Sequence, residues 1–458
     1  MRKYKFHILA FLISFFVLAQ FNFDPDLGWH LAYGERFLAS GQIINQDSFS
    51  WTMPGFDWAN PYFLYQIIIA ELFKRIGFFY SAILFGVLAS LGVLIAAKIR
   101  SLLSFLVAFL GVIIVFPNLG VKPHVFDFLL FGLLLLMLER KLYKKIKFIP
   151  VWFLFFALWA NLHMGFLIGF LVFCAFVVVD FFWEKVRGIK RTVWQPALML
   201  LSAFLGTLLT PLNFRIWKYL IFDSHVPISR IYVDEFLPAV MVFPLNLFYL
   251  LSGLIFIYIF LKNFKKIEPA WLLVGAFTFM LPFLTSFFDI FWGAMFIFIA
   301  SRHLEFNIKW KGFWERLPLV FSLTIACTVL FLNFFLNAYD SYKNHSELKR
   351  YPVGAIAFMK EKGLNENLYN DYGWGGFLDW QYRQGRIFID GRMAGWRKPD
   401  GVYILQDYIK IAQGDCNTVQ RYNIKIALIK KEDNLVCFAK WNKVYEDEVA
   451  KVLVKPKN

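Results

Sequence analysis

Two aspartates, a histidine and a glutamate stand close together just after the first apolar segment, in FDPDLGWHLAYGERFLASG (23–41). If residues 26–39 form a helix, Asp26, His30 and Tyr33 lie on one face, because side chains four or seven positions apart line up along a helix. A carboxylate in this position can act as a general base that takes the proton from an acceptor hydroxyl or amine as it attacks a sugar. A histidine one turn away can orient that carboxylate. The candidate catalytic residues are therefore Asp26, Asp24, His30 and Glu35.

Structural interpretations of the same stretch compete with the catalytic one. Asp24 can cap the N-terminus of the helix, an alternative of equal weight, and Asp26 can be a solvated acid that the helix dipole stabilises. Gly41 is a typical helix-stopping residue. We expect the helix to lie on the outer membrane surface, with an apolar stripe on lipid formed by Leu27, Leu31 and Leu38. The pair Asp24 and Asp26 is also a candidate ligand set for Mg²⁺ or Mn²⁺, and no other cofactor is indicated.

The composition is that of a polytopic membrane protein. Of the 458 residues, 59% are hydrophobic and only 17% are charged. Apolar segments of about 17–22 residues, each long enough to cross a hydrocarbon core of about 30 Å as a helix, recur up to residue 337. Later residues have the charge density of a soluble domain. We therefore expect an α-helical membrane domain (1–338) and a separate domain of mixed α/β type (339–458).

Basic residues predict the orientation, since short loops rich in Lys and Arg stay on the cytoplasmic side. With the N-terminus inside, the inner segments hold 21 of the 28 Lys and Arg residues of the membrane domain. This bias accounts for most of the formal charge of +16, so a nucleic acid partner is not indicated. The prediction is a multi-pass inner-membrane protein with a cytoplasmic N-terminus and an extracytoplasmic C-terminal domain. The eleven predicted spans are about 6–22, 78–97, 101–116, 124–139, 148–162, 164–183, 195–211, 244–261, 269–285, 287–301 and 317–337.

Two long outer segments, 22–77 and 211–243, interrupt the spans, and we expect function there. The loop SWTMPGFDWANPY (50–62) belongs to the first segment. Residues 62–75 are expected to form an interfacial helix or the start of the next span. The second segment contains Asp234 and Glu235, which we expect to be solvated. The predicted substrate-binding residues of the first segment are Tyr33, Trp58 and Asn60.

Further polar candidates occupy short outer turns. Lys122 and His124 lie between the third and fourth spans, where a cation can hold a donor phosphate. An ordinary turn without a binding role is an alternative of equal weight. His163 lies in the next outer turn, and a histidine at membrane depth indicates a functional site unless its hydrogen bonds serve packing alone. Asp127 and Asp289, near outer ends of spans, can line a cavity or form interhelical hydrogen bonds.

In the C-terminal domain, polar residues follow strand-like stretches, where sites are often built in α/β folds. The expected elements are helices at 353–361 and 402–412, strands at 386–389 and 424–430, and a hairpin at 443–454. The candidate acceptor-binding residues are Asp371, Trp374, Asp390 and Arg392. Three indoles can stack on sugar rings or serve packing, namely Trp374, Trp380 and Trp396. Cys416 and Cys437 can pair in an oxidising exterior.

The outer loop after the first span opens with an aspartate and continues in a helix that ends in Ser40-Gly41. In this the chain resembles the GT-C superfamily of lipid-phosphate-sugar glycosyltransferases. This superfamily includes protein O-mannosyltransferases and lipid A aminoarabinose transferases. Asp26 lies at the position where these enzymes carry their catalytic aspartate. The next position, which holds a second acid in these enzymes, is occupied by Leu27 in this chain, which leaves Asp24 or Glu35 as substitutes. The resemblance implies transfer of a sugar from a polyprenyl-phosphate donor in the membrane lipid to a glycan, lipid or protein acceptor on the outer face, with Asp26 as the general base.

The chain resembles more closely a bacterial branch of this superfamily, over nearly its whole length. The shared motifs are DPDxxWHLxxGE (24–35), DxFS[FW]TxPGxxW (47–58), WxNxHxG (159–165), and NDYxWGG (370–376) with FIDGR (388–392). The competing classes are a transporter of lipid-linked glycans and a non-catalytic binding or assembly protein. The outer position of the polar residues and the lack of an internal repeat weigh against transport.

Overall fold

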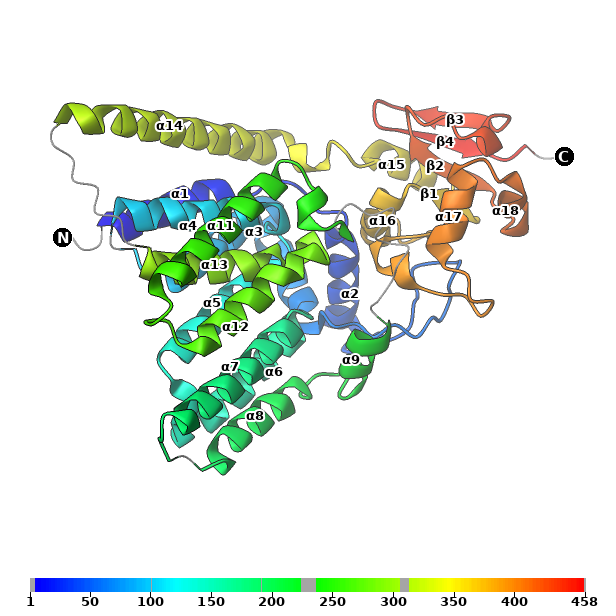
Figure 1. Cartoon of the computed structure of the whole chain (residues 1–458). Helices are drawn as coiled ribbons and strands as arrows, with labels where there is room; N and C mark the ends of the chain where they lie inside the picture. Colours follow the sequence, from blue (N-terminus) through cyan, green and yellow to red (C-terminus); the bar gives the residue numbers. More distant parts are fainter. Residues whose placement is uncertain (1–4, 100, 191, 224–235, 305–312, 457–458) are drawn as a thin grey trace. The chain divides into compact units, whose positions relative to one another are not determined.

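The chain forms two compact units in the computed structural model, which describes residues 5–99, 101–190, 192–223, 236–304 and 313–456 (Figure 1). Unit 1 consists of Met1–Phe21, Phe78–Asn213 and Val233–Asp340. Unit 2 consists of Asn22–Gly77, Phe214–Tyr232 and Ser341–Asn458. The first long outer segment, which composition assigned to the membrane domain, therefore shares a unit with the C-terminal residues. Asp234 and Glu235 lie outside the described residues.

Unit 1 is helical, and a helix occurs at each predicted span. Among the described residues, α3, α7 and α11 are long and apolar enough to cross a membrane, and shorter apolar helices accompany them. These apolar helices indicate a membrane location, whereas the crossing of all eleven spans stays a prediction. The helices are α1 (Lys5–Leu18), the second part of α3 (Phe63–Ala96), α4 (Leu102–Val115), α5 (His124–Glu139), α6 (Ile149–Leu162), α7 (Phe166–Val186), α8 (Trp194–Thr207), α11 (Leu245–Asn263), α12 (Pro269–Met280), α13 (Asp289–His303) and most of α14 (Phe313–Asn344).

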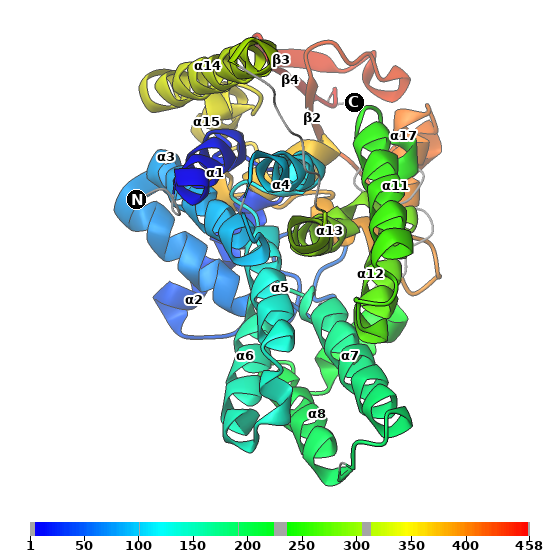
Figure 2. The ribbon, with the colours of Figure 1, turned by 60° about the vertical axis from the view of Figure 1, so that its left-hand side comes forward.

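Small residues bring neighbouring helices of unit 1 close together. A β-carbon on Gly86 of α3 would lie 2.5 Å from the methyl group of Ala19, and one on Gly206 of α8 would lie 2.2 Å from the carbonyl oxygen of Phe153 on α6. Close approach increases van der Waals contact, which drives helix association where lipid removes the hydrophobic contribution. Helices α6 and α8 accordingly run side by side (Figure 2).

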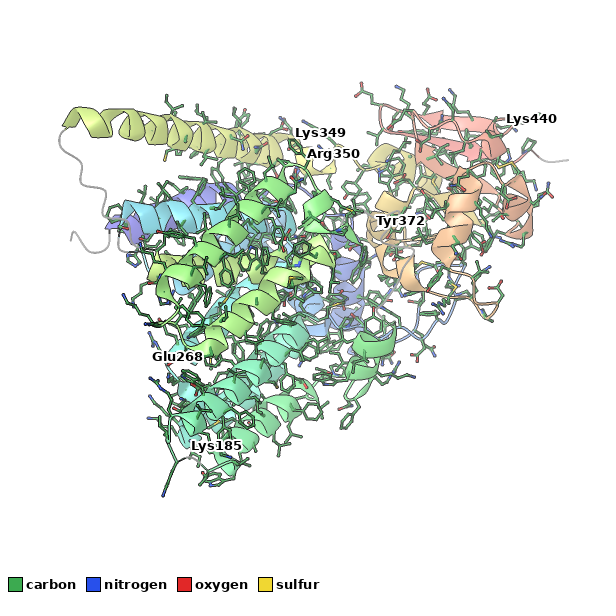
Figure 3. All side chains as sticks on the ribbon, viewed as in Figure 1. Lys185, Glu268, Lys349, Arg350, Tyr372 and Lys440 are labelled. Atoms are coloured by element: carbon green, nitrogen blue, oxygen red, sulfur yellow. A yellow bond between two sulfur atoms is a disulfide. The ribbon has the colours of Figure 1, made fainter. Side chains whose placement is uncertain are left out.

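Charged residues gather at one end of unit 1. The ammonium group of Lys144 lies 2.6 Å from Glu184 at the end of α7, and that of Lys141 lies 2.6 Å from Glu268 just before α12. Figure 3 shows Glu268 and Lys185 near this end. Several of the predicted inner segments therefore meet at the same end of the helices, and the side of the membrane that this end faces stays a prediction.

The N-terminal part of unit 2 begins with α2 (Leu27–Ser40), which confirms the helix predicted at 26–39. Gly41 ends it with a left-handed backbone (φ 68°), and its N–H donates to the carbonyl oxygen of Phe37, as expected for a helix-stopping glycine. The Asp24 carboxylate accepts the backbone N–H of Asp26 (3.0 Å) and closes the turn before the helix. The first part of α3 follows and breaks at Gly77 (φ 71°).

The C-terminal part of unit 2 contains a four-stranded mixed sheet with the order β1-β2-β4-β3. β1 (Leu368–Asn370) is parallel to β2 (Ile426–Lys430), whereas β4 (Ala450–Val454) is antiparallel to both β2 and β3 (Asn442–Glu446). These elements confirm the predicted strand at 424–430 and the hairpin at 443–454. Unit 2 also contains the helices α9 (Arg215–Lys218), α15 (Val353–Glu361), α16 (Gly375–Gln381), α17 (Ile404–Ala412) and α18 (Cys416–Arg421), of which α15 and α17 were predicted.

The stretch 386–389, predicted as a strand, is not part of this sheet. Ile387 instead forms a parallel bridge with Ser50 of the outer loop. The N–H of Ile387 donates to the carbonyl oxygen of Phe49, and the N–H of Trp51 donates to Ile387, each at 3.1 Å. The apolar run is buried because the outer loop pairs with it, a partner more than 300 positions away that local periodicity cannot reveal.

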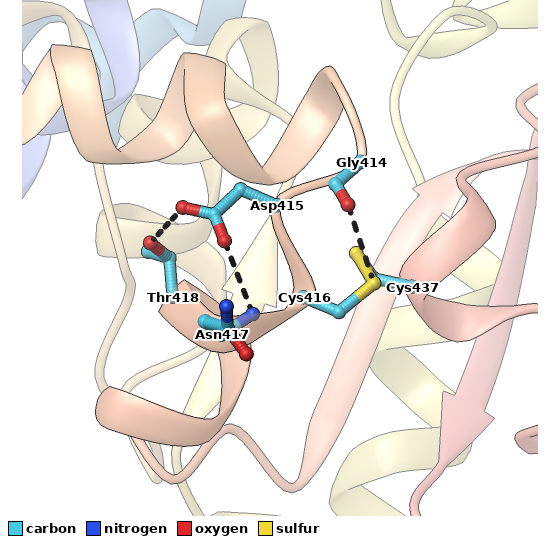
Figure 4. Close-up of a disulfide and its surroundings, with 6 residues drawn as sticks. All are labelled: Gly414, Asp415, Cys416, Asn417, Thr418 and Cys437. Atoms are coloured by element: carbon cyan, nitrogen blue, oxygen red, sulfur yellow. Dashed lines mark hydrogen bonds between the residues drawn. A yellow bond between two sulfur atoms is a disulfide. The ribbon is translucent and has the colours of Figure 1, made fainter.

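Cys416 and Cys437 form a disulfide (Figure 4). The bond joins the start of α18 to a residue 21 positions later, ahead of β3. The Asp415 carboxylate caps α18 by accepting the N–H of Asn417 (3.1 Å) and the hydroxyl of Thr418 (2.8 Å). The disulfide therefore fixes a helix start that is already held by its cap.

Candidate functional site

Asp26 is half-buried at the start of α2. Its Oδ1 accepts a hydrogen bond from Nε1 of Trp29 (3.0 Å), one turn later on the same helix. A β-carbon on Gly391 would lie 2.0 Å from this oxygen, so a glycine at 391 gives the carboxylate its space. The first motif of the chain and its FIDGR motif therefore meet at the carboxylate of Asp26.

Glycines also let α2 pack closely against α16. A β-carbon on Gly28 would lie 2.1 Å from the carbonyl oxygen of Gly376, and one on Gly376 would lie 2.3 Å from the carbonyl oxygen of Pro25. Leu27 and Leu31 are buried at 1% and 0% exposure. The prediction that they rest on lipid is wrong, because every residue from Leu27 to Gly34 is buried within the protein.

The remaining candidate catalytic residues are already engaged. His30 is buried, and its ring contacts the rings of Trp29, Tyr62 and Tyr65 at centroid distances of 3.5, 4.9 and 4.7 Å. The Glu35 carboxylate accepts a hydrogen bond from Nε1 of Trp380 (3.0 Å) and pairs with Arg383. His30 thus belongs to an aromatic cluster and Glu35 to an ion pair.

Asp47 organises the outer loop. Its carboxylate accepts the N–H of Phe49 (3.3 Å) and both the N–H (3.0 Å) and hydroxyl (2.6 Å) of Ser50. The hydroxyl of Thr52 donates to the carbonyl oxygen of Phe388 (2.6 Å). The motif D-x-F-S-W-T therefore provides a folded loop and its attachment to the FIDGR segment.

The buried guanidinium of Arg392 lies where these segments meet. It donates from Nε to Asp390 (3.0 Å), from Nη1 to the hydroxyl of Tyr33 (2.6 Å) and from Nη2 to Asp47 (3.2 Å). Asp379 lies 3.6 Å from the same Nη2, and all four charged side chains have no solvent exposure. Four rings surround the guanidinium at 5.2–5.3 Å, those of Tyr33, Phe49, Trp58 and Trp396.

Three carboxylates around one guanidinium cannot all stay ionised without water. Burial, with the neighbouring charge of Asp390, raises the pKa of Asp379 well above its usual range. Among the described residues, neither oxygen of Asp379 accepts a hydrogen bond, which also fits a protonated carboxyl group. Burial opposes the charge of Arg392, but Asp390 and the other acids raise its pKa well above the usual value. Burial and the charge of Asp390 therefore favour the neutral form of Asp379 beside the charged Arg392.

Several predicted contact residues are buried in this structure. Asp390 and Arg392, predicted to contact an acceptor, are buried and bonded to each other. Tyr33 and Trp58, predicted to bind substrate, are 3% exposed and belong to the same cluster. Asn60 is buried in a reciprocal amide pair with Gln66.

The predicted sugar-stacking indoles also serve packing. Trp374 is buried and donates from Nε1 to the carbonyl oxygen of Arg350 (2.9 Å). Trp396 stacks on Phe56 at 4.5 Å, and Trp380 stacks on Phe23 at 5.8 Å. Asp371, at the end of β1, caps the turn Tyr372–Trp374 by accepting the N–H of Gly373 (3.0 Å). These are structural roles in unit 2.

Unit 1 brings a second polar cluster together at the outer turns. Oδ1 of the fully buried Asp127 accepts a hydrogen bond from Nε1 of Trp159 (2.6 Å), and its Oδ2 pairs with Nδ1 of His163. The ring of His124 lies 4.6 Å from that of His163. Lys122 is half-buried two residues before His124. Two of the predicted substrate-binding residues, His124 and His163, are therefore neighbours.

The fold as a whole matches a solved structure. The archaeal oligosaccharyltransferase AglB from Archaeoglobus fulgidus, in complex with an inhibitory peptide and a dolichol-phosphate, superposes with a TM-score of 0.56 over 93% of this chain and 70% of that chain, at 11% sequence identity. AglB is a GT-C superfamily membrane glycosyltransferase. The present chain has the GT-C fold.

Two structures of ArnT from Cupriavidus metallidurans also resemble the chain. The apo form and the form bound to undecaprenyl phosphate have TM-scores of 0.47 and 0.48, at 13% and 12% identity. Each comparison covers 98% of this chain, and 96% and 97% of ArnT respectively. No protein-family model and no curated protein matches the sequence.

In this GT-C fold the residue after Asp26 is Leu27, whose side chain is buried. An acidic side chain at this position would lose its hydration, which is costly. Among the described residues, no three His, Cys, Asp or Glu side chains gather as a metal-binding group. A divalent cation on Asp24 and Asp26 would therefore depend on donor oxygens and water for its other ligands. Mg²⁺ or Mn²⁺ stays a prediction.

Sequence reasoning did not identify two parts of the site. Trp29 was not a candidate, although its position three residues after Asp26 places both on one helix face. Asp47 and Asp379, the acids around Arg392, were also missed. Asp47 has a recognisable signal in the serine that follows three positions later, whereas nothing near Asp379 distinguishes it from a surface acid.

Proposed function

We propose that the protein is an integral membrane glycosyltransferase that transfers a sugar from a polyprenyl-phosphate donor to an acceptor on the outer face of the membrane. The observation that carries the proposal is the GT-C fold shared with AglB, whose structure contains a dolichol-phosphate, over 93% of the chain. The half-buried carboxylate of Asp26 adds to it, because it opens the loop that follows the first apolar helix. The acceptor is a glycan, a lipid or a protein.

Asp26 is the proposed general base. An acceptor oxygen or nitrogen attacks the anomeric carbon of the donor sugar, and the bond between that carbon and the phosphate oxygen breaks. The acceptor proton passes to Asp26, and polyprenyl phosphate leaves with the bonding electrons. The hydrogen bond from Trp29 and the contact with Gly391 fix the carboxylate before the acceptor arrives, which lowers the cost of orientation. Asp24 acts as a positioning residue through its bond to the backbone of Asp26.

Lys122, His124 and His163 are the proposed donor-phosphate residues. Cations and imidazole N–H groups stabilise a phosphate whose charge grows as the sugar leaves. They lie at the end of the helices opposite to the lysine-rich end formed by Lys141 and Lys144, since α5 begins at His124 and ends at Glu139. With the lysine-rich end inside, these three residues face the extracytoplasmic side.

The test compares Asp26→Asn with Asp57→Asn, a matched change at an acid of the same outer segment whose side chain is 66% exposed. Purified protein is incubated with a panel of polyprenyl-phosphate-linked sugars and a cell-envelope acceptor extract, and sugar transfer is measured. We expect transfer by the wild type and by Asp57→Asn, and a loss of at least about 100-fold in Asp26→Asn. Equal transfer by both variants would exclude Asp26 as the base.

The same experiment separates the competing classes. A transporter moves the lipid-linked sugar across vesicles without forming a new glycosidic bond, and a binding protein retains it unchanged. Either result for the wild type, with every donor of the panel, would overturn the proposed transfer reaction.

A further inference from the structure

Asp127 is a carboxylate with no solvent exposure near the start of α5 in unit 1. Three of the four specified residues of the motif W-x-N-x-H-x-G, at the junction of α6 and α7, contact it or make room for it. Trp159 donates to one carboxylate oxygen, and His163 pairs with the other. A β-carbon on Gly165 would lie 2.3 Å from the carboxylate carbon. The motif thus forms the surroundings of a carboxyl group that lies more than 30 positions earlier in the chain.

The hydrogen bonds fix how the His163 ring is held. The N–H of Gly165 lies 3.3 Å from Nδ1 of His163, which would require this nitrogen to accept, whereas the pair with Asp127 requires it to donate. The contact with the carboxyl oxygen is much closer, so the proton lies on Nδ1 and points to Asp127. This bond sets the tautomer and the plane of the ring, and with them the direction of Nε2.

Asn161 adds a backbone restraint to the same turn. Its amide donates to the carbonyl oxygen of Ala157 (2.8 Å) on α6 and to that of Leu209 (2.6 Å) after α8. Asn161 therefore ties the end of α6 to the segment that follows α8, while Asp127 bonds to the imidazole of His163 itself. A ring that only filled space would not need a buried carboxylate, which is costly unless its charge is used or compensated.

We propose that Asp127 is a positioning residue that holds the His163 imidazole against the phosphate of the donor and of the released polyprenyl phosphate. The inference rests on the proposed function for its ligand and adds a residue to that site. Its role is to orient His163, with Trp159 and Gly165 as its supports. The phosphate gains negative charge on leaving the sugar, so the oriented imidazole contributes more to the transition state and to product binding than to substrate binding.

The experiment measures binding of tritiated polyprenyl phosphate to the purified full-length protein, and kcat and KM for transfer in parallel. Asp127→Asn keeps the size of the side chain, and we expect polyprenyl phosphate affinity to fall about 10–100-fold. The loss in kcat should exceed the change in donor KM. Gly165→Ala should act in the same direction by displacing the carboxylate. Gly132→Ala on the same helix α5 is the control, since its β-carbon meets nothing closer than 3.4 Å.

A double-mutant comparison separates positioning from general stability. If Asp127 acts through His163, Asp127→Asn combined with His163→Gln binds polyprenyl phosphate no more weakly than His163→Gln alone. Additive losses, or a loss that follows only the thermal stability of the variants, would overturn the inference. A wild-type protein that does not bind polyprenyl phosphate would overturn it too. Binding without transfer would refute the proposed reaction and leave the role of Asp127 standing, so the two failures are distinguishable.

Discussion

Replacing Arg392 by Met should destabilise unit 2 strongly, because it removes the cation from a cluster without solvent exposure. The guanidinium contacts the buried carboxyl groups of Asp390 at 3.0 Å and Asp47 at 3.2 Å. Removing one partner of a buried ion pair costs about 3–5 kcal/mol, because the other charge is left without compensation. A typical domain has only about 5–15 kcal/mol of unfolding free energy, so this loss is a large part of the total.

The measurement is thermal unfolding of detergent-solubilised protein followed by tryptophan fluorescence. The expected loss corresponds to a decrease in Tm of about 6–20 °C. Arg383→Met is the control: this arginine pairs with Glu35, but its side chain is 64% exposed. Exposed pairs contribute about 0–1 kcal/mol, so the control should unfold within a few degrees of the wild type. An Arg392→Met protein as stable as the control would refute the charge cluster.

A second variant keeps this prediction testable if Arg392→Met does not accumulate. Arg392→Met combined with Asp390→Asn removes one of the carboxyl groups that Arg392→Met leaves without a cation. The double variant should therefore be more stable than Arg392→Met alone. If the additional change instead lowers stability further, packing rather than charge dominates the cluster.

Three shorter predictions follow from other contacts. The pKa of Asp379 is raised in the folded state, so the folded protein binds this proton more tightly than the unfolded chain does. The free energy of unfolding should therefore fall as the pH rises from about 4 through the raised pKa. Asp379→Asn should remove this pH dependence in urea unfolding, and an unchanged dependence would contradict the prediction. Gly391→Ala places a methyl group 2.0 Å from the Asp26 carboxylate. It should reduce sugar transfer at least about 10-fold with little change in polyprenyl phosphate binding. The control Gly373→Ala, whose nearest contact is at 3.3 Å, should not reduce sugar transfer. Replacing both Cys416 and Cys437 by Ser should lower the unfolding free energy by about 3 kcal/mol, and dithiothreitol should have this effect on the wild type alone.

The sequence predicts the helices of unit 1 well, because each apolar segment has the length and uniform character that a membrane imposes. It also predicts α2 and its end at Gly41, since local signals determine both. The environment of α2 was not predictable in the same way. The amphipathic pattern placed Leu27 and Leu31 on lipid, but a protein surface formed by distant residues covers them instead.

The candidate site shows the same division. Polar residues in an apolar chain directed attention to Asp26, Lys122, His124 and His163, and two of these, His124 and His163, are neighbours in space. The burial of Arg392 was not predictable, because a charged residue after a strand-like stretch has the same local signal whether it faces solvent or a buried cluster. Burial depends on what covers the residue, and at this position the cover is the outer loop.

The hydrogen bond between Arg392 and Tyr33 joins residues 359 positions apart. At a synthesis rate of about 5–20 residues per second, the outer loop would leave the ribosome roughly 20–70 s before its arginine partner exists. During that interval the loop has Asp47 but no cation to compensate it, so it cannot reach its final form. Assembly of the Asp26 site is therefore one of the last events in the biogenesis of this protein, and chains released early should reach the membrane with their helices inserted and this site unformed.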